Sequence, residues 1–228
     1  MSVLIIIPAR GGSKGIPRKN IKMFHGKPLI VHTIDTALRS GIDGRVIVST
    51  DDDEIADIAI RAGAEVPFKR PKEFARDEST SAEVVNHVLE QIGDTYDSIM
   101  LLQPTSPLRK PEDLKQCLQI LQTHQCDAVV SVAEVKEHPY LMYSVTSTGR
   151  LDPYCAEDDK PARRQDYPTL FRLNGSIYVV KTEAWKKHRS FQKIENRQAY
   201  IMPFERSVDI DDTLDWHVAE LLAREVFP

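Results

Sequence analysis

The sequence predicts a doubly wound α/β fold built on a mostly parallel sheet. Short runs rich in Val and Ile alternate along the chain with amphipathic segments, several of which end at a glycine. Some of the Val- and Ile-rich runs are almost entirely apolar, which is typical of strands covered by helices on both faces. With 228 residues, of which 41% are hydrophobic, the chain is long enough for a single domain spanning residues 1–228.

The first two thirds of the chain supply most of this pattern. The predicted strands are residues 3–7, 45–49, 65–68, 98–102 and 128–135. The predicted helices cover residues 30–38 before Gly41, 55–62 before Gly63, 84–92 before Gly93, and a segment that starts at Pro111. Glycine readily adopts the left-handed conformation that ends a helix, and proline is favourable in a first turn. Strands that alternate with helices in this way favour a parallel sheet.

The alternation stops between residues 136 and 171. This stretch is polar, and only residues 140–145 carry a weak strand signal; its prolines are Pro139, Pro153, Pro161 and Pro168. We therefore predict that residues 136–171 form a small inserted arm. Beyond the arm the pattern resumes with strands at 175–180 and 199–202, a short helix near 182–187 and a closing helix from about 213 to 226.

Composition narrows the class of partner. A net charge of -4 with mixed signs does not fit a nucleic-acid-binding protein, which normally has a basic excess. The first 34 residues nevertheless contain no acid and six cations, namely Arg10, Lys14, Arg18, Lys19, Lys22 and Lys27. The three cysteines have no spacing typical of disulfide frameworks or zinc sites, and the apolar run at residues 3–7 is too short for a signal peptide or membrane span. We expect a cytoplasmic protein that binds a small anion, with no membrane or nucleic-acid partner.

A glycine-rich basic loop, residues 8–20, follows the first predicted strand. In open α/β sheets, ligands bind outside the carboxyl ends of the strands, where this loop emerges. Glycines allow the backbone to approach phosphate oxygens, and Arg and Lys neutralise the charge of those oxygens. The loop matches neither the P-loop pattern nor the dinucleotide fingerprint. It therefore predicts a phosphate site of another kind.

Several motifs carry a family resemblance over nearly the whole chain. They are Ile7 to Asn20, Arg70-Pro71 with Asp77 and Ser81, Leu102 to Arg109, Arg164-Gln165, Arg172 to Tyr178, and Asp209-Ile210-Asp211. In this order they resemble the cytidylyltransferases that activate 3-deoxy-2-ulosonic acids. The amino-acid sequence of the first motif between Ser13 and Asn20 is similar to that of the acylneuraminate members.

The resemblance implies a Rossmann-like nucleotidyltransferase fold and a reaction that joins CTP to a nine-carbon acidic sugar of the sialic acid class, with release of pyrophosphate. It implies catalytic roles for Arg10, Lys14, Lys19, Asp209 and Asp211. It implies nucleotide binding by Ala9, Arg10, Gly11, Gly12, Ser13, Lys19, Asn20, Arg70, Ser79 and Ser81. It implies sugar binding by Gln103, Thr105, Arg164, Asn174 and Tyr178.

Asp209 and Asp211 are the predicted metal ligands. They are two residues apart in a segment that reads as extended, so their side chains project from the same face. Two carboxylates on one face suit Mg²⁺ that also contacts phosphates. The alternative is that this acidic cluster only caps the last helix. We assign that capping to Asp212, helped by Asp215, and the metal to the earlier pair.

Other readings stay open at this point. An enzyme for the eight-carbon sugar Kdo usually has Ser-x-Arg-Leu-Pro in the first loop, where this chain has Ser13-Lys14-Gly15-Ile16-Pro17. A non-catalytic nucleotide-binding module would not need the acidic pair. Where some bacterial sialate enzymes place a lysine, this chain has Tyr140-Leu141-Met142, which raises legionaminate and pseudaminate as candidates beside N-acetylneuraminate.

The arm is the predicted assembly device. Residues 140–143 place apolar side chains in a segment that a lone domain would struggle to bury. The resemblance implies a homodimer in which each arm completes the sugar pocket of the other chain, with Arg164 serving the neighbouring site.

Overall fold

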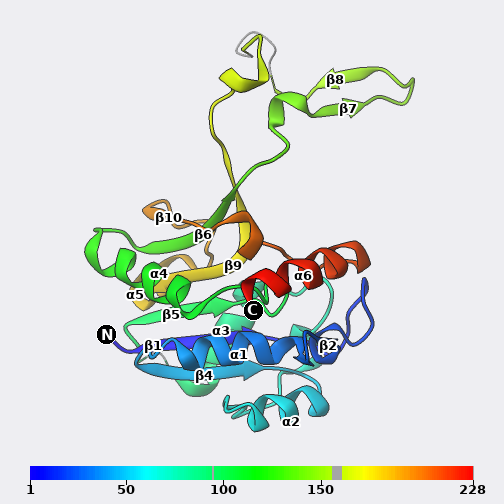
Figure 1. Cartoon of the computed structure of the whole chain (residues 1–228). Helices are drawn as coiled ribbons and strands as arrows, with labels where there is room; N and C mark the ends of the chain where they lie inside the picture. Colours follow the sequence, from blue (N-terminus) through cyan, green and yellow to red (C-terminus); the bar gives the residue numbers. More distant parts are fainter. Residues whose placement is uncertain (94, 156–160, 228) are drawn as a thin grey trace.

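The computed structural model describes residues 1–93, 95–155 and 161–227. Its centre is a six-stranded sheet with the strand order β10-β6-β9-β5-β1-β4 (Figure 1). The strands are β1 (Val3–Pro8), β4 (Gly44–Ser49), β5 (Ser98–Leu102), β6 (Ala128–Glu134), β9 (Phe171–Lys181) and β10 (Arg197–Ile201). All neighbouring pairs are parallel except the two that involve β9, which runs antiparallel to both β5 and β6. The prediction of a mostly parallel sheet is confirmed.

Helices cover both faces of the sheet. They are α1 (Leu29–Arg39), α2 (Asp53–Arg61), α3 (Ser81–Ile92), α4 (Pro111–Thr123), α5 (Thr182–His188) and α6 (Thr213–Val226). Val3, Ile5 and Ile7 of β1 join one buried cluster with α1, α2 and α4, whereas Leu4 and Ile6 join another with α3 and α5. Figure 1 shows α1 in front of the sheet and α3 behind it. The doubly wound prediction is thus confirmed, because β1 alternates its apolar side chains between two helical layers.

The last helix has a core of its own. Trp216, Ala219 and Ala223 of α6 pack with Phe24 and Ile210 in a third buried cluster. Phe24 belongs to the short hairpin formed by β2 (Met23–Phe24) and β3 (Lys27–Pro28). This cluster fixes the chain that precedes α6 against the chain that follows the first loop. Two segments almost 200 residues apart in sequence are thereby held together.

The predicted turns between elements are largely observed, and one predicted strand is wrong. Gly41, Gly63 and Gly93 have positive φ angles of 63°, 94° and 84°, as expected after a helix end. Residues 65–68 do not form a strand, because only Glu65 bridges to β4, beside Ile47. Pro67 has no N–H for a ladder, so the pairing stops there.

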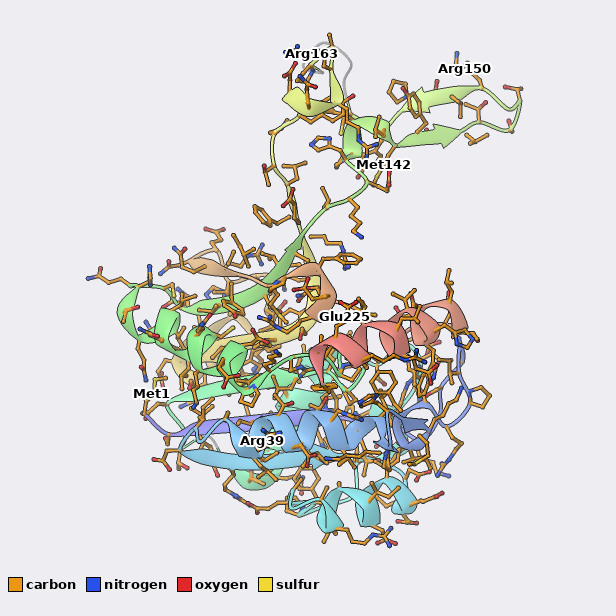
Figure 2. The ribbon with its side chains drawn as sticks, in the orientation of Figure 1. Met1, Arg39, Met142, Arg150, Arg163 and Glu225 are labelled. Carbon is orange, nitrogen blue, oxygen red and sulfur yellow. The ribbon has the colours of Figure 1, made fainter. Side chains whose placement is uncertain are left out.

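The arm is the loop of a long β-hairpin. β6 ends at Glu134 opposite Phe171, where β9 begins, and the chain between them leaves the body (Figure 1). It carries the small hairpin of β7 (Tyr143–Val145) and β8 (Leu151–Pro153), and Figure 2 shows its labelled Met142, Arg150 and Arg163 far from the sheet. Residues 156–160 of the predicted arm lie outside the described residues.

A cluster of rings stiffens the described part of the arm. His138 packs against Tyr140 and Tyr167 with ring centroids 4.6 Å and 4.9 Å away, and its Nε2 lies 3.1 Å from the carbonyl of Pro168. The weak strand predicted at residues 140–145 is only partly observed, because residues 139–141 form a 3-10 turn that Pro139 begins. Among the described helices, none has the length and apolar character to cross a membrane.

Candidate active site

A cleft of about 350 Å³ opens where the loops leave β1 and β5. Its walls are the glycine-rich basic loop, the segment that leads into α3, the turn after β5, and the chain before α6. Eleven predicted site residues line it: Arg10, Ser13, Lys14, Lys19, Asn20, Arg70, Ser79, Ser81, Gln103, Thr105 and Asp211. The structure therefore brings together residues from four segments that are far apart in sequence, at the sheet edge where the loop was expected.

Two glycines allow the basic loop to pack as it does. The Gly11 N–H donates to Asp51 Oδ1 at 3.0 Å, and a Cβ on Gly11 would lie 2.7 Å from the Asp52 carboxylate. A Cβ on Gly15 would collide with the backbone carbonyl of Asp211. The loop is thus pressed between the chain after β4 and the chain before α6.

Other predicted loop residues support its shape. Ala9 is buried, and its N–H continues the pairing of β1 with Ser49 at 2.9 Å. A Cβ on Gly12 would meet no described atom within 4 Å, so the local packing gives no reason for a glycine there. Asn20 is buried and donates to the Arg10 carbonyl at 2.9 Å. The backbone of Arg10 is thereby fixed while its side chain reaches the cleft.

Lys19 connects the basic loop to the acidic segment. Its Nζ donates to the Ile210 carbonyl at 2.5 Å and lies 3.6 Å from Asp211 Oδ1. Only 12% of the Lys19 side chain is exposed, whereas 79% of that of Asp211 is. Lys19 is therefore a largely buried cation at the point where the loop meets the carboxylates.

Arg10 and Lys14 share one counter-ion across the cleft. Arg10 Nη1 lies 2.5 Å from Asp77 Oδ1, and Lys14 Nζ lies 2.7 Å from Asp77 Oδ2. Hydrogen bonds from Lys14 and then from Arg10 lower the pKa of Asp77, and the same contact raises the pKa of Lys14. Arg18 instead pairs with Asp52 and Glu54 at the start of α2.

Arg70 is a buried cation of the opposite wall. Its N–H donates to the Thr50 carbonyl at 2.7 Å, and its Nη2 lies 3.9 Å from Asp51 Oδ1. Its Nε has no hydrogen-bond partner among the described residues, and burial lowers the pKa of its guanidinium. An unpartnered buried donor of this kind suits a ligand that brings an acceptor.

The two predicted serines flank the start of α3. The Ser79 hydroxyl accepts from the Arg76 N–H at 3.0 Å and donates to the Glu73 carbonyl at 3.3 Å. Ser81 is the first residue of α3, behind a capping box of Thr80 and Glu83. Both serines line the cleft, and the side chain of Ser79 already serves its own turn.

A fully buried arginine shapes the turn after β5. Arg109 donates through Nε and Nη2 to the Ser106 carbonyl at 3.0 Å and 2.8 Å, and through Nη2 also to the Gln103 carbonyl. Burial lowers the pKa of Arg109, opposed by Asp113 and Asp209. Gln103 and Thr105 project from this turn into the cleft, so Arg109 positions them without lining the cleft itself.

Asp209 and Asp211 lie on a segment held beside that turn. The Ile210 N–H donates to the Thr105 carbonyl at 2.8 Å. Asp209 is largely buried, which raises the pKa of its carboxyl, while a hydrogen bond from Thr105 opposes the rise. Its Oδ1 is buried with no partner in the described part of the chain. Asp209 is not itself part of the cleft lining.

Helix capping falls to other residues, as predicted. Asp212 Oδ1 accepts from the Asp215 N–H at 3.0 Å, and Asp215 Oδ2 accepts from the N–H groups of Asp211 and Asp212 at 3.0 Å each. The carboxylates of Asp209 and Asp211 take no part in the capping box. Across residues 1–93, 95–155 and 161–227, no group of three or more His, Cys, Asp or Glu could hold a metal, so an ion here would rest on these two carboxylates and on substrate oxygens.

Three of the predicted sugar-binding residues stand apart from the cleft lining. Asn174 is buried and its amide already bonds Ser131 at 2.6 Å and Ser207 at 3.0 Å. Tyr178 packs against Phe191 with ring centroids 5.1 Å apart. Arg164 lies in the arm and donates to the Lys136 carbonyl at 3.2 Å.

Sequence reasoning assigned no role to three residues that the structure places at the site. Each contacts a residue that lines the cleft: Asp51 contacts Arg70, Asp77 contacts Arg10 and Lys14, and Arg109 contacts the Gln103 carbonyl. Asp77 and Arg109 belong to two of the family motifs described above, and this membership is the sequence signal that points to a role for them. Asp51 follows β4 at the same sheet edge as the basic loop, so its position was also a signal.

Comparisons with known proteins agree with this arrangement. The family model for cytidylyltransferases matches residues 4–216. The CMP-N,N'-diacetyllegionaminic acid synthase of Legionella pneumophila is 37% identical over 227 residues, covering 97% of this chain and 96% of that protein. The N-acylneuraminate cytidylyltransferase of Streptococcus agalactiae is also 37% identical, over 95% of this chain and 52% of that protein, so the chain spans about half the length of that relative.

A solved structure supports the fold. CMP:2-keto-3-deoxy-manno-octonic acid synthetase complexed with CTP superposes with a TM-score of 0.73 over 99% of both chains, at 17% identity. The predicted Rossmann-like nucleotidyltransferase fold is therefore confirmed. Because the family model spans most of the chain and relatives share more than a third of its residues, the chain belongs to the cytidylyltransferase family.

Proposed function

We propose that this protein transfers CMP from CTP to a nine-carbon 2-ulosonic acid of the sialic acid class and releases pyrophosphate. The observation that carries the proposal is the cleft itself, in which a basic loop, a buried arginine with a free donor and an acidic segment face one another. Among such sugars, a legionaminate is favoured, because the Legionella relative is 37% identical over nearly the full length of both chains, whereas a pseudaminic acid cytidylyltransferase of Campylobacter jejuni with the same coverage is 34% identical.

The cations of the basic loop are placed to hold the triphosphate. The sugar's anomeric hydroxyl attacks the α-phosphorus, and pyrophosphate leaves from the opposite side. Negative charge on the leaving pyrophosphate requires fixed cations close by. Arg10, Lys14 and Lys19 supply them, and Lys19 needs little reorganisation because it is already held at the Ile210 carbonyl.

The opposite wall suits the nucleoside. Arg70, with its free Nε, offers a donor to the carbonyl of cytosine, and Ser79 and Ser81 stand beside it. Fixed donors and acceptors in a small pocket distinguish cytosine from uracil, because the exocyclic groups of the two bases have opposite hydrogen-bond sense. Gln103 and Thr105 are left to contact the acceptor sugar.

Asp209 and Asp211 are suited to hold Mg²⁺. The unpartnered Oδ1 of Asp209 is a buried acceptor, and carboxylate oxygens are the ligands that Mg²⁺ prefers. When bound, the ion neutralises charge on the phosphate oxygens. Lys19, 3.6 Å from Asp211, keeps that carboxylate beside the phosphate-binding loop.

The working unit that we propose is a homodimer. The described arm exposes Leu141, Met142, Tyr143, Val145, Leu151 and Tyr154. In Figure 2 the arm stands clear of its own domain, so these side chains need a partner's surface to become buried. Arg164, at 3.2 Å from the Lys136 carbonyl near the base of the arm, then serves the neighbour's sugar carboxylate.

Pyrophosphate release across a panel of ulosonic acids tests the proposal. We expect Mg²⁺-dependent release with CTP and a legionaminate, slower release with Kdo, and little release with UTP. Replacing Arg10 or Lys19 by Ala should slow the release, whereas the matched control Arg61→Ala, at the exposed end of α2, should not. Release that survives chelation, or that runs equally fast with UTP, would exclude this function.

A further inference from the structure

Asp77 lies at the tip of a small turn on the wall opposite the basic loop. The Ser79 N–H donates to the Arg76 carbonyl at 3.2 Å, and the Ser79 hydroxyl accepts from the Arg76 N–H at 3.0 Å. The preceding 3-10 helix, residues Lys72–Phe74, and α3 hold the two ends of this segment. The turn is therefore a preformed unit that carries two carboxylates, Asp77 and Glu78, of which Asp77 lines the cleft.

That carboxylate occupies the cations that the proposed function assigns to phosphate. Its two oxygens contact Arg10 and Lys14 separately, at 2.5 Å and 2.7 Å, so both positive charges are paired. The contacts join the two walls, since Arg10 and Lys14 belong to one wall and Asp77 to the other. A carboxylate that grips two cations with two oxygens has the charge and reach of one phosphate group.

We propose that Asp77 is an internal counter-ion that stands in for phosphate and must be displaced when a polyphosphate binds. The inference rests on the proposed function, because it takes Arg10 and Lys14 to be the phosphate-binding cations. Both ion pairs are partly exposed, with 34% of the Asp77 side chain accessible, so each is weak and exchangeable. A ligand with several charges replaces both contacts at once.

This exchange makes Asp77 a specificity-determining residue. Ligands that do not reach Arg10 and Lys14 leave the pairs intact and gain nothing from those cations. A polyphosphate breaks both pairs and takes over both cations, so its affinity is lowered by the strength of the pairs it displaces. Asp77 thereby sets how tightly the cleft holds both the triphosphate that enters and the pyrophosphate that leaves.

Pyrophosphate binding measured by titration calorimetry at low salt tests this directly. We expect D77N to bind pyrophosphate about three- to tenfold more tightly than the wild type, because two weak exposed pairs no longer compete. D77E keeps the charge and should stay within about twofold. Cytidine, which has no phosphate, should bind all variants equally.

D35N is the matched control. Asp35 pairs with Lys27 at 2.5 Å, and 32% of its side chain is exposed, but it lies outside the cleft lining. It removes the same charge from the protein and should leave pyrophosphate affinity unchanged. Thermal unfolding of each variant shows whether the fold is retained, which we expect because Asp77 is not in the core.

A double-mutant cycle separates direct competition from a general charge effect. In the wild type, Lys14 only changes partner from Asp77 to pyrophosphate, whereas in D77N it gains a partner. K14Q should therefore cost at least threefold more affinity in the D77N background than in the wild type. Additive effects, or unchanged or weaker binding by D77N, would overturn the proposal.

The test is independent of the sugar reaction. Because it measures pyrophosphate and needs neither turnover nor a sugar, a wrong sugar or an absent dimer leaves its outcome intact. If pyrophosphate binds neither the wild type nor D77N, the phosphate assignment of the loop fails, and the counter-ion role fails with it. If pyrophosphate binds but D77N gives no gain, only the counter-ion role fails.

Discussion

Replacing Arg109 by Met should loosen the turn that carries Gln103 and Thr105. The change removes three hydrogen bonds and leaves the Ser106 carbonyl without its buried donor, whereas the Gln103 carbonyl still accepts from the Ser106 N–H at 3.3 Å. One unsatisfied buried acceptor costs about 1–3 kcal/mol. Relief from burying the guanidinium charge offsets part of this, because Arg109 is fully buried. We expect the free energy of unfolding to fall by about 1–2 kcal/mol.

Urea unfolding and steady-state kinetics together check this expectation. kcat/KM for the sugar should fall at least tenfold, because about 1.4 kcal/mol of lost positioning already gives that factor. Arg109→Lys should recover part of the stability but little of the turn geometry, since one ammonium cannot reproduce the fork of the guanidinium. Arg61→Met, on the exposed end of α2, is the control. An Arg109→Met enzyme with wild-type stability and kinetics would refute the positioning role.

Three further predictions concern Asp209, the glycines of the basic loop, and the arm. Asp209→Asn should lower kcat about a hundredfold or more, yet the variant should be more stable than the wild type at neutral pH. Burial raises the pKa of Asp209 in the folded state, so the wild type loses stability as pH rises from the unfolded pKa through the folded one. A difference in urea midpoint between variant and wild type that is the same at pH 4 and pH 7 would contradict this. Gly15→Ala should raise KM for CTP at least tenfold, because its Cβ meets the Asp211 carbonyl, whereas Gly12→Ala should change KM less than about twofold; equal effects would discount the packing argument. Mixing Arg164→Ala with Asp209→Ala chains under subunit exchange should give activity above both parents if arms cross, and a mixture no better than its parents would exclude crossing.

Sequence patterns predict most of the fold because strands that are buried on both faces appear in the sequence as continuous apolar runs. β1, β4, β5 and β6 were found as apolar runs, and the glycines at helix ends marked their limits. Strand direction leaves no such trace, so the antiparallel course of β9 was not foreseen. β9 also starts four residues before its predicted start at residue 175, because its first part pairs with the base of the arm.

The parts of the candidate site that can be predicted from sequence are those whose functional residues lie close together in the chain. The basic loop and the 209–211 segment needed only local reading. Asn174 is predicted to bind the sugar, but in the structure its amide bonds Ser131 and Ser207, which are distant in sequence, and it does not line the cleft. Asp77 likewise acquires its partners only through folding. Contacts between side chains that are distant in sequence can be identified only in the folded structure.

The position of the arm inside the β6–β9 hairpin has a consequence for how this protein changes over time. The arm begins after Glu134 and ends at Phe171, which are paired neighbours in the sheet, so the two attachment points stay the same whatever chain lies between them. Closing a longer loop costs only slightly more entropy than closing a shorter one. Length and sequence of the arm can therefore drift without disturbing the strands that carry the nucleotide cleft. In the proposed dimer, acceptor choice and subunit pairing are therefore free to diversify with the arm, while the nucleotide cleft stays under separate selection.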